Sequence, residues 1–402
     1  MKKVAFLISI CSGLIGMSCS GIEIEVLHDF AGTSDGANPV ASLVRGSDGA
    51  WYGTTAGGGN SGNGTFFKLV DEQFIHLGNF SIASNPYSEL LAVGTDFYGT
   101  TLNGGANDQG TVYKVNEKSG LVTIIHDFSL EEGKNPSALT KASDGNFYGT
   151  ATFGGKHGTG TIFKLTPTGN FSKIYDFPPV STQKKTNGTN PVSIVAVDDF
   201  LYGVTEYGGK KTLPSFDGCG TVFQSTSDGV VNNIHIFAEQ FSDQGCVPTK
   251  LISGEFGQLD GVTATCKHTP GLSCEGVVFT IDKEGTTYKI LQSFIQNQGG
   301  GAVSAFGLKE VAGGGFFVAL RNQGARYGCG GLYASFFSSL KFIVFNGTNG
   351  CHPESAPVEE HGVYYGVTYQ GGLHDMGVIY KLTQFPIQGQ RERKEVENVN
   401  EY

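Results

Sequence analysis

Histidine is the side chain that most often binds metals or transfers protons near neutral pH, and this chain contains nine of them. His28, His126 and His235 each stand two residues before a phenylalanine, at matching positions of a tandem repeat, and His76 lies at a nearby position. Residues at matching positions of separate repeat units lie far apart in space, so these histidines cannot share one metal ion. We expect them to form local hydrogen bonds at strand ends, and we predict no metal and no cofactor.

Other residues could contact a ligand without doing chemistry on it. The sequence has no His-Glu-x-x-His motif, and its Gly-Gly pairs precede no helix whose N-terminus could bind a phosphate. Aromatic and charged side chains around a concave mouth suit a glycan or peptide ligand. We assign no catalytic residue, and the candidates for ligand binding are Tyr207, Lys210, Lys211, Phe216, Asp217, Lys267, His268, Arg326, Tyr327, His374 and Asp375.

The elements that must position these residues follow from the repeat. Clear copies of Tyr-Gly-Thr-Thr begin at Tyr52, Tyr98, Tyr148, Tyr202 and Tyr365, and decayed copies begin at Asp260 and Phe317. The copies are 46 to 58 residues apart. Seven units of this length, rich in glycine, β-branched and aromatic residues, predict an all-β fold, a seven-bladed β-propeller of four-stranded antiparallel blades. We expect the repeated tyrosines to pack between blades, and the glycine after each to allow close approach of the next sheet.

One unit is read as four strands, named a to d in chain order. In the third unit these are residues 147–151, 160–165, 171–177 and 192–197, separated by Gly, Pro, Asn and Asp turns. The d–a link is a tight turn and the c–d link is long, so we place strand d innermost and order each blade d–a–b–c. The chain opens with a strand c at 23–30 and ends with strand b at 378–382. We therefore expect the N-terminal strand to complete the last blade and close the ring.

Six cysteines follow the N-terminal segment, and none has the C-x-x-C spacing of a zinc site. The a–b and c–d loops of a meander emerge at the same end of a blade, so all six lie on one face. That face also has the longest a–b loops, at 206–219 and 264–275, and we expect any ligand to bind there. The repeat register predicts three disulfides, Cys219–Cys246, Cys266–Cys274 and Cys329–Cys351.

The repeat residues also carry a resemblance. The stretches WYGTTAGGGNSGNGTFFKL from Trp51, FYGTATFGGKHGTGTIFKL from Phe147 and YYGVTYQGGLHDMGVIYKL from Tyr364 resemble the GloVer-type tandem repeats of bacterial surface and secreted proteins. The match is clear in units one to four and seven and weak in units five and six. The resemblance implies an extracytoplasmic propeller, and it brings no catalytic residue with it.

Residues 1–21 resemble a secretory signal peptide, with Lys2 and Lys3 before a short apolar stretch and small residues after it. Cys19 is a lipidation candidate because Gly-Met-Ser-Cys is similar to a lipobox, and plain secretion is the alternative. We assign 22–385 to the propeller and 386–402, which is charged and poor in apolar residues, to a disordered tail. No later segment is apolar enough to span a membrane, so we predict a secreted or cell-surface protein.

The formal net charge of −10 argues against nucleic-acid binding, which requires a basic face. We expect a monomeric, non-enzymatic scaffold that binds a glycan or a protein. The alternative is a secreted polysaccharide hydrolase or lyase that uses the mouth of the propeller, which rests on analogy of fold. Two acidic groups, or an acid and a histidine, facing each other across the channel would favour the enzyme.

Overall fold

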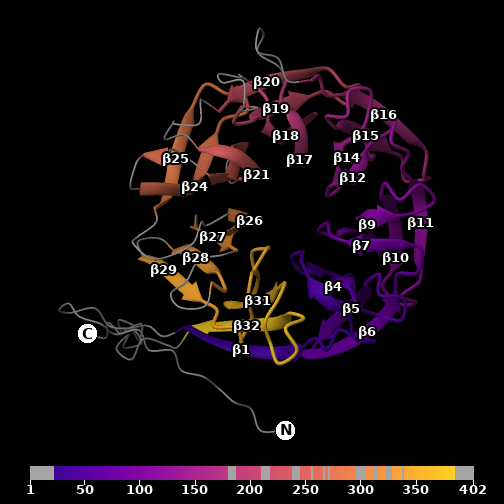
Figure 1. Cartoon of the computed structure of the whole chain (residues 1–402), viewed down its shortest axis with the longest axis vertical. Coiled ribbons are helices and arrows are strands. Elements are labelled where there is room, and N and C mark those ends of the chain that lie inside the picture. The colour runs from indigo at the N-terminus through magenta and orange to yellow at the C-terminus, as the bar shows by residue number, and fades with distance from the viewer. Residues whose placement is uncertain are drawn as a thin grey trace, which may run out of the picture.

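The computed structural model describes residues 22–179, 187–209, 218–237, 245–254, 257–265, 268–269, 272–295, 305–311, 315–321, 328–336 and 339–384. These residues form seven antiparallel sheets and no α-helix, so none of the described segments is a helix that could span a membrane. Figure 1 shows the sheets as blades around a central axis, which confirms the predicted seven-bladed propeller. The predicted signal peptide (1–21, with Cys19) and tail (386–402) lie outside the described residues.

The blades follow one another along the chain. Blade one contains β2 (Ala37–Pro39), β3 (Val44–Arg45), β4 (Trp51–Gly57), β5 (Thr65–Val70) and β6 (Gln73–Asn79). Blade two contains β7 (Ala83–Pro86), β8 (Leu91–Val93), β9 (Asp96–Gly104), β10 (Thr111–Asn116) and β11 (Val122–Asp127). Blade three contains β12 (Lys134–Pro136), β13 (Thr140–Lys141), β14 (Phe147–Phe153), β15 (Thr161–Leu165) and β16 (Phe171–Asp176).

The remaining four blades complete the circle. Blade four contains β17 (Thr189–Val197), β18 (Phe200–Tyr207), β19 (Thr221–Ser225) and β20 (Val231–Ile236). Blade five contains β21 (Cys246–Ser253), β22 (Leu259–Thr265), β23 (His268–Thr269), β24 (Leu272–Ile281) and β25 (Tyr288–Ile295). Blade six contains β26 (Ala305–Val311), β27 (Gly315–Leu320), β28 (Gly331–Phe336) and β29 (Ser339–Val344). Blade seven contains β30 (Val358–Glu360), β31 (Val363–Thr368), β32 (Val378–Gln384) and β1 (Ile22–Asp29).

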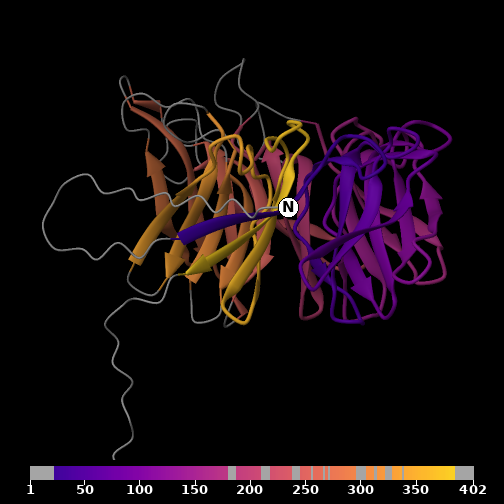
Figure 2. The same cartoon turned by 90° about the horizontal axis from the view of Figure 1, so that it is seen from below.

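The ring is closed by the N-terminal strand, as predicted. Strand β1 pairs antiparallel with β32, from Ile22 opposite Gln384 to Asp29 opposite Val378. Figure 2 shows β1, in indigo, lying against the yellow C-terminal strand. The last blade therefore contains both ends of the described chain, and neither β1 nor β32 is left as a solitary strand.

The inner strands begin in a repeated way. In six blades a residue with φ between 54° and 59° stands directly before a proline: Asn38, Asn85, Asn135, Asn190, Val247 and His352. This left-handed residue turns the chain from the c–d loop into the inner strand. In five of the six cases, all but Asn85, its N–H donates to a carbonyl of the preceding blade. For example, the N–H of Asn190 donates to the carbonyl of Thr159 in the a–b loop of blade three, at 2.8 Å. The residues just after each proline are thereby directed toward the axis.

Two of the three predicted disulfides are confirmed. Cys219 is bonded to Cys246 and Cys329 to Cys351. Because strand d of each repeat unit belongs to the next blade, these bridges join blade four to blade five and blade six to blade seven. The third prediction involves Cys266, which lies outside the described residues.

The core consists of seams between blades, and the repeated tyrosine belongs to them. The side chain of Tyr148 is fully buried and packs in one cluster with Ile194, Leu201 and Phe223 of blade four. Our prediction that these tyrosines pack between blades is confirmed at this seam. Tyr52, Tyr98 and Tyr202 occupy the corresponding seams.

The glycine after this tyrosine has a different role from the one we expected. We predicted that it allows the next sheet to approach closely. A Cβ on Gly149 would instead lie 2.4 Å from the ring of Phe163, which is paired with Gly149 on the adjacent strand of the same blade. The glycine makes room for an aromatic ring of its own sheet, and this ring then faces the preceding blade, where it packs with Tyr98.

Candidate functional site

The structure describes few of the loop residues that we proposed for ligand binding. Lys210, Lys211, Phe216, Asp217, Lys267, Arg326 and Tyr327 lie outside the described residues, and His268 is described only as part of the short strand β23. Tyr207 ends β18, and His374 is exposed in the a–b loop of blade seven. Asp375 accepts a hydrogen bond from the N–H of Gly371 at 2.9 Å and so closes its own loop. A ligand contact by any of these residues stays a prediction.

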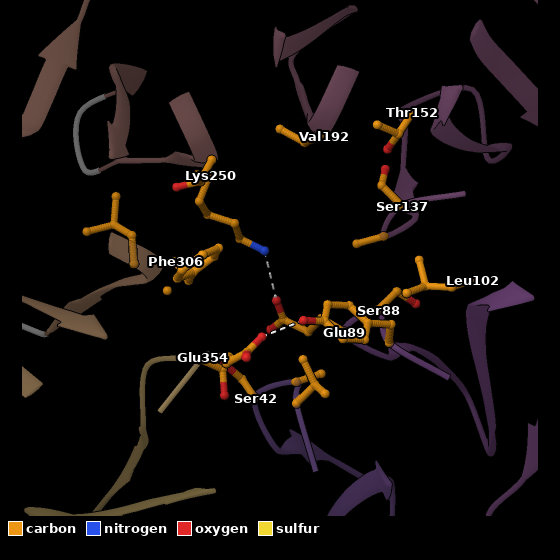
Figure 3. A pocket seen from close by; sticks show the side chains of 18 of the residues that line it. Ser42, Ser88, Glu89, Leu102, Ser137, Thr152, Val192, Lys250, Phe306 and Glu354 are labelled. Carbon is orange, nitrogen blue, oxygen red and sulfur yellow. Dashed lines mark hydrogen bonds and ion pairs between the residues drawn. The ribbon is translucent and has the colours of Figure 1, made fainter. Parts of the chain in front are cut away.

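The clearest cavity lies on the propeller axis, at the end of the channel from which the a–b and c–d loops emerge. Its volume is about 290 Å³, at the lower end of the range for small-molecule sites. All seven blades line it, mostly with residues that follow the proline of the inner strand, such as Tyr87, Lys250 and Glu354. The ends of strands β9, β14 and β18 add Leu102, Thr152 and Glu206. Figure 3 shows Leu102, Thr152, Lys250 and Glu354 around one space.

A salt bridge crosses this axial cavity. Nζ of Lys250, from blade five, lies 3.3 Å from Oε2 of Glu89, from blade two (Figure 3). Burial by itself would raise the pKa of Glu89, but the positive charges of Lys250 and Lys309 hold the pKa below its ordinary value. Glu89 is therefore an ionised carboxylate at neutral pH, and its charge is compensated within the cavity.

A second acidic group is also compensated. The side chain of Glu354 is only 3% exposed, and its Oε1 lies 3.2 Å from Nε of Arg321. The hydroxyl of Tyr87 donates a hydrogen bond to Oε2 of the same carboxylate. Burial, and then the charge of Glu354, raise the pKa of Tyr87, so the tyrosine remains a neutral donor. The guanidinium of Arg321 in turn lies over the ring of Phe306, at 5.6 Å from its centroid.

Two polar groups of the lining have no such partner. Within the described ranges, Glu206 forms no hydrogen bond and no ion pair, and burial raises its pKa above the ordinary value. The hydroxyl oxygen of Ser355 is buried without a hydrogen-bond partner in the described part of the chain. Glu206 is only partly buried, whereas leaving a buried hydroxyl such as that of Ser355 unpaired is costly. The carboxyl of Glu206 is therefore the lining group that a bound molecule can reach and satisfy.

No residue of the axial lining was among the candidates predicted from the sequence. The signal that could have found it is the Asn-Pro step at 38–39, 85–86, 135–136 and 190–191, because the residues that follow each step turn toward the axis. In the sequence these prolines served only as signs of the turns between strands. Glu206 was not named as a candidate, although it directly precedes the candidate Tyr207.

The repeated histidines do not take part in this site. His28, His126 and His235 lie on the outer strands of blades seven, two and four. Each ring stacks nearly parallel on an aromatic ring of the next blade, with interplanar angles of 2° to 4°. His28 also makes the local hydrogen bond that we expected, to Asp35 at 3.2 Å. Their position on the rim and their stacking indicate a role in holding the blades together.

The chemistry open to the axial cavity is mainly that of hydrogen bonding. Its described lining contains no histidine, and two of its three carboxylates, Glu89 and Glu354, are neutralised by cations. Within the described residues, no group of three or more His, Cys, Asp or Glu side chains is arranged to hold a metal ion. The lining offers hydroxyl, carboxylate and ammonium groups beside the apolar ring of Phe306.

Comparison with known proteins identifies a family and a fold. The model of the Gloeobacter/Verrucomicrobia repeat family matches two overlapping stretches, residues 12–216 and 85–333. No match was found among curated proteins.

Solved structures of similar shape share little sequence with this chain. A streptogramin B lyase has a TM-score of 0.56 at 13% identity, over 90% of this chain and 98% of its own. An oligogalacturonate lyase from Vibrio parahaemolyticus has a TM-score of 0.56 at 11% identity, over 95% and 96%. The extracellular domain assigned to a hybrid two component system of B. thetaiotaomicron has a TM-score of 0.54 at 12% identity, over 87% of this chain and 40% of its own. At such identities the similarity establishes the fold alone.

Proposed function

Since this chain belongs to the Gloeobacter/Verrucomicrobia repeat family and its propeller has a polar cavity on the axis, we propose that it is an extracytoplasmic, non-enzymatic binding protein whose ligand is a glycan. The observation that carries the proposal is the axial lining, in which side chains from all seven blades meet around about 290 Å³. A space of this size suits one sugar residue or the end of a glycan chain.

The lining matches the chemistry of a sugar. Each sugar hydroxyl both donates and accepts hydrogen bonds, and the cavity offers both kinds of partner. The carboxyl of Glu206 is free to bond to it, and Lys250 and Glu89 can share their remaining hydrogen-bonding capacity. The ring of Phe306 provides the apolar surface that the C–H face of a sugar requires.

Binding fits this lining better than catalysis does. Glycoside hydrolysis usually needs two carboxyl groups, of which one gives up a proton and the other attacks or activates water. Here Glu89 and Glu354 are held in ion pairs, and Glu354 also accepts a hydrogen bond from Tyr87. Such groups orient a ligand well, but their negative charge is already compensated.

A polysaccharide hydrolase or lyase is the second candidate. One observation favours it: Glu206 is unpaired in the described structure and burial raises its pKa, as expected of a general acid. The experiment below therefore includes an activity measurement.

The disulfides support the proposed compartment. Disulfides such as Cys219–Cys246 and Cys329–Cys351 persist in oxidising environments outside the cytoplasm. Together with the signal peptide predicted at 1–21, they favour export of the protein. Anchoring through Cys19 is part of the same proposal, and mass spectrometry of the exported protein would detect the lipid.

The test combines a glycan array with titration calorimetry on purified protein. We expect at least one glycan to bind, and Glu206→Gln to weaken this binding because it removes a carboxyl group from the lining without leaving a partner unpaired. The matched control is Glu131→Gln, an exposed glutamate in the c–d loop of blade three that does not line the cavity. If Glu206→Gln binds the glycan as tightly as Glu131→Gln does, the axial site is refuted. Shortening of the bound glycan by the wild type, and not by Glu206→Gln, would establish the enzyme instead.

A further inference from the structure

A second cavity lies on the opposite face of the propeller, between blades seven and one. Its volume is about 550 Å³. The d–a turn at Asp48 and Gly49 and the b–c turn at Asp71 and Glu72 line it together with Trp51 and Tyr365, and the lining also contains Arg45, Leu69 and Glu360. The turns of this face are short, but at this seam they surround a hollow. We call it the seam cavity.

The other blades provide an internal comparison for this seam. In units one and two the repeated tyrosine meets the aromatic residue that directly precedes the tyrosine of the next unit. The ring centroids are 4.6 Å apart for Tyr52 and Phe97 and 4.7 Å apart for Tyr98 and Phe147. For Tyr365 and Trp51 the separation is 6.4 Å. The aromatic pair is therefore more widely spaced at the closing seam than at these two seams.

The aromatic rings of the closing seam are also more exposed to solvent than their equivalents at the other two seams. Phe97 and Phe147 are each only 1% exposed, and Tyr52 is fully buried. Trp51 and Tyr365, at the equivalent positions of the closing seam, are both only partly buried. An aromatic pair that is core elsewhere in the molecule is thus accessible to solvent here, and it lines a cavity.

The local sequence at the closing seam also differs from that of blades one and three. In blades one and three the tyrosine hydroxyl donates to an aspartate of its own d–a turn, as Tyr148 does to Asp144 at 2.8 Å. Blade seven has His361-Gly362 at this turn and no aspartate. Its lysine, Lys381, bonds instead to Glu72 of the next blade at 2.6 Å. The tyrosine of blade seven therefore lacks the turn carboxylate that holds its counterparts.

The indole of Trp51 is held in place by charged neighbours. Its Nε1–H donates to Oε2 of Glu360 at 3.0 Å, and Oε1 of Glu360 lies 2.6 Å from Nη2 of Arg45. The guanidinium of Arg45 lies over the indole, 4.9 Å from the ring centroid. A ring that is fixed in this way loses little conformational entropy when a ligand binds to it.

We propose that the seam cavity is a second binding site, which takes a sugar ring of a neutral oligosaccharide. The lining combines partly exposed aromatic rings with hydrogen-bonding carboxylate and guanidinium groups, as an amphipathic sugar ring requires. Three of its four carboxylates are paired within the protein, Glu360 with Arg45, Glu72 with Lys381 and Asp48 with Lys68. The fourth, Asp71, lies in an exposed turn. Matched charges can still accept and donate hydrogen bonds to hydroxyl groups, but they give an ionic ligand little net attraction. This site is independent of the axial cavity and of the proposal made for it.

The chain provides its own reporter for this site, because Trp51 is its only tryptophan. We would titrate the purified protein with maltohexaose, cellohexaose, xylohexaose and mannohexaose and record tryptophan fluorescence. Tetralysine and hexagalacturonate serve as cationic and anionic probes. We expect at least one neutral hexasaccharide to change the fluorescence in a saturable way below about 10 mM, a concentration at which even a millimolar site is mostly filled.

Two variants test the residues. Trp51→Phe introduces the residue that blades two and three have at this position, so the fold should be retained, and calorimetry should show affinity reduced at least about tenfold. Glu206→Gln, in the axial cavity, should leave the fluorescence titration unchanged. The proposal is overturned if none of the neutral hexasaccharides changes the fluorescence, if only tetralysine or hexagalacturonate does, or if Trp51→Phe binds as the wild type does.

Discussion

Acid should destabilise this propeller through a buried histidine on its rim. The ring of His235 stacks on Tyr288 of the next blade, with centroids 4.3 Å apart and planes within 2°. Its Nε2 is buried and has no hydrogen-bond partner in the described part of the chain. Burial therefore lowers the pKa of His235 to about 4.

The size of the effect follows from proton linkage. In the unfolded chain a histidine has a pKa of about 6.5, so between pH 6.5 and 4 the unfolded state binds a proton that the folded state does not. The contribution of His235 to stability is complete above pH 6.5 and is lost as the pH falls toward 4. At pH 4.5 the loss relative to pH 7.5 amounts to roughly 2.5 kcal/mol, from about 1.4 kcal/mol per pKa unit.

The assay is guanidinium unfolding at pH 7.5 and 4.5 for the wild type and for His235→Phe. Phenylalanine keeps a ring that can stack on Tyr288 and does not titrate. His28 and His126, whose pKa values burial also lowers, are present in both proteins, so their effects cancel. The wild type should lose about 2–3 kcal/mol more than the variant between the two pH values. If the wild type and His235→Phe lose the same unfolding free energy between pH 7.5 and 4.5, the titration of His235 is refuted.

Three further outcomes follow from buried groups. Tyr148→Ala should lower the free energy of unfolding by about 3–5 kcal/mol, since the ring is fully buried. Tyr148→Phe should lower it by only about 1 kcal/mol, for the lost hydrogen bond to Asp144. Equal losses for the two variants in denaturant unfolding would contradict the packing role. Glu206→Gln should raise the melting temperature at pH 8 and have little effect at pH 4, because burial penalises only the charged carboxylate, and an unchanged melting temperature at pH 8 would count against the raised pKa. Replacing Cys219 and Cys246 by serine should cost about 3.5 kcal/mol from loop entropy over 27 residues, and a non-reducing melting curve like that of the wild type would show that the bridge does not constrain the unfolded chain.

The sequence by itself determined the architecture. A repeated tetrapeptide at a nearly constant interval is enough to count the blades, and the two incomplete ends of the repeat predict that β1 pairs with β32. It also predicted two disulfides, because Cys219 and Cys246 fall in loops at the same end of the repeat. These predictions succeed because each depends on local strand order, which neighbouring residues encode.

The binding cavities were decided only by the tertiary structure. The hydroxyl of Tyr87 meets Glu354 across 267 residues, and Lys250 meets Glu89 across 161, because ring closure brings the inner strands of distant blades to one axis. Likewise, Trp51 occupies a repeat position that is buried in blades two and three, and its exposure depends on how far blade one stands from blade seven. A repeat specifies what each blade contributes, but the distances across the axis and at the closing seam arise only when all seven blades are packed in a ring.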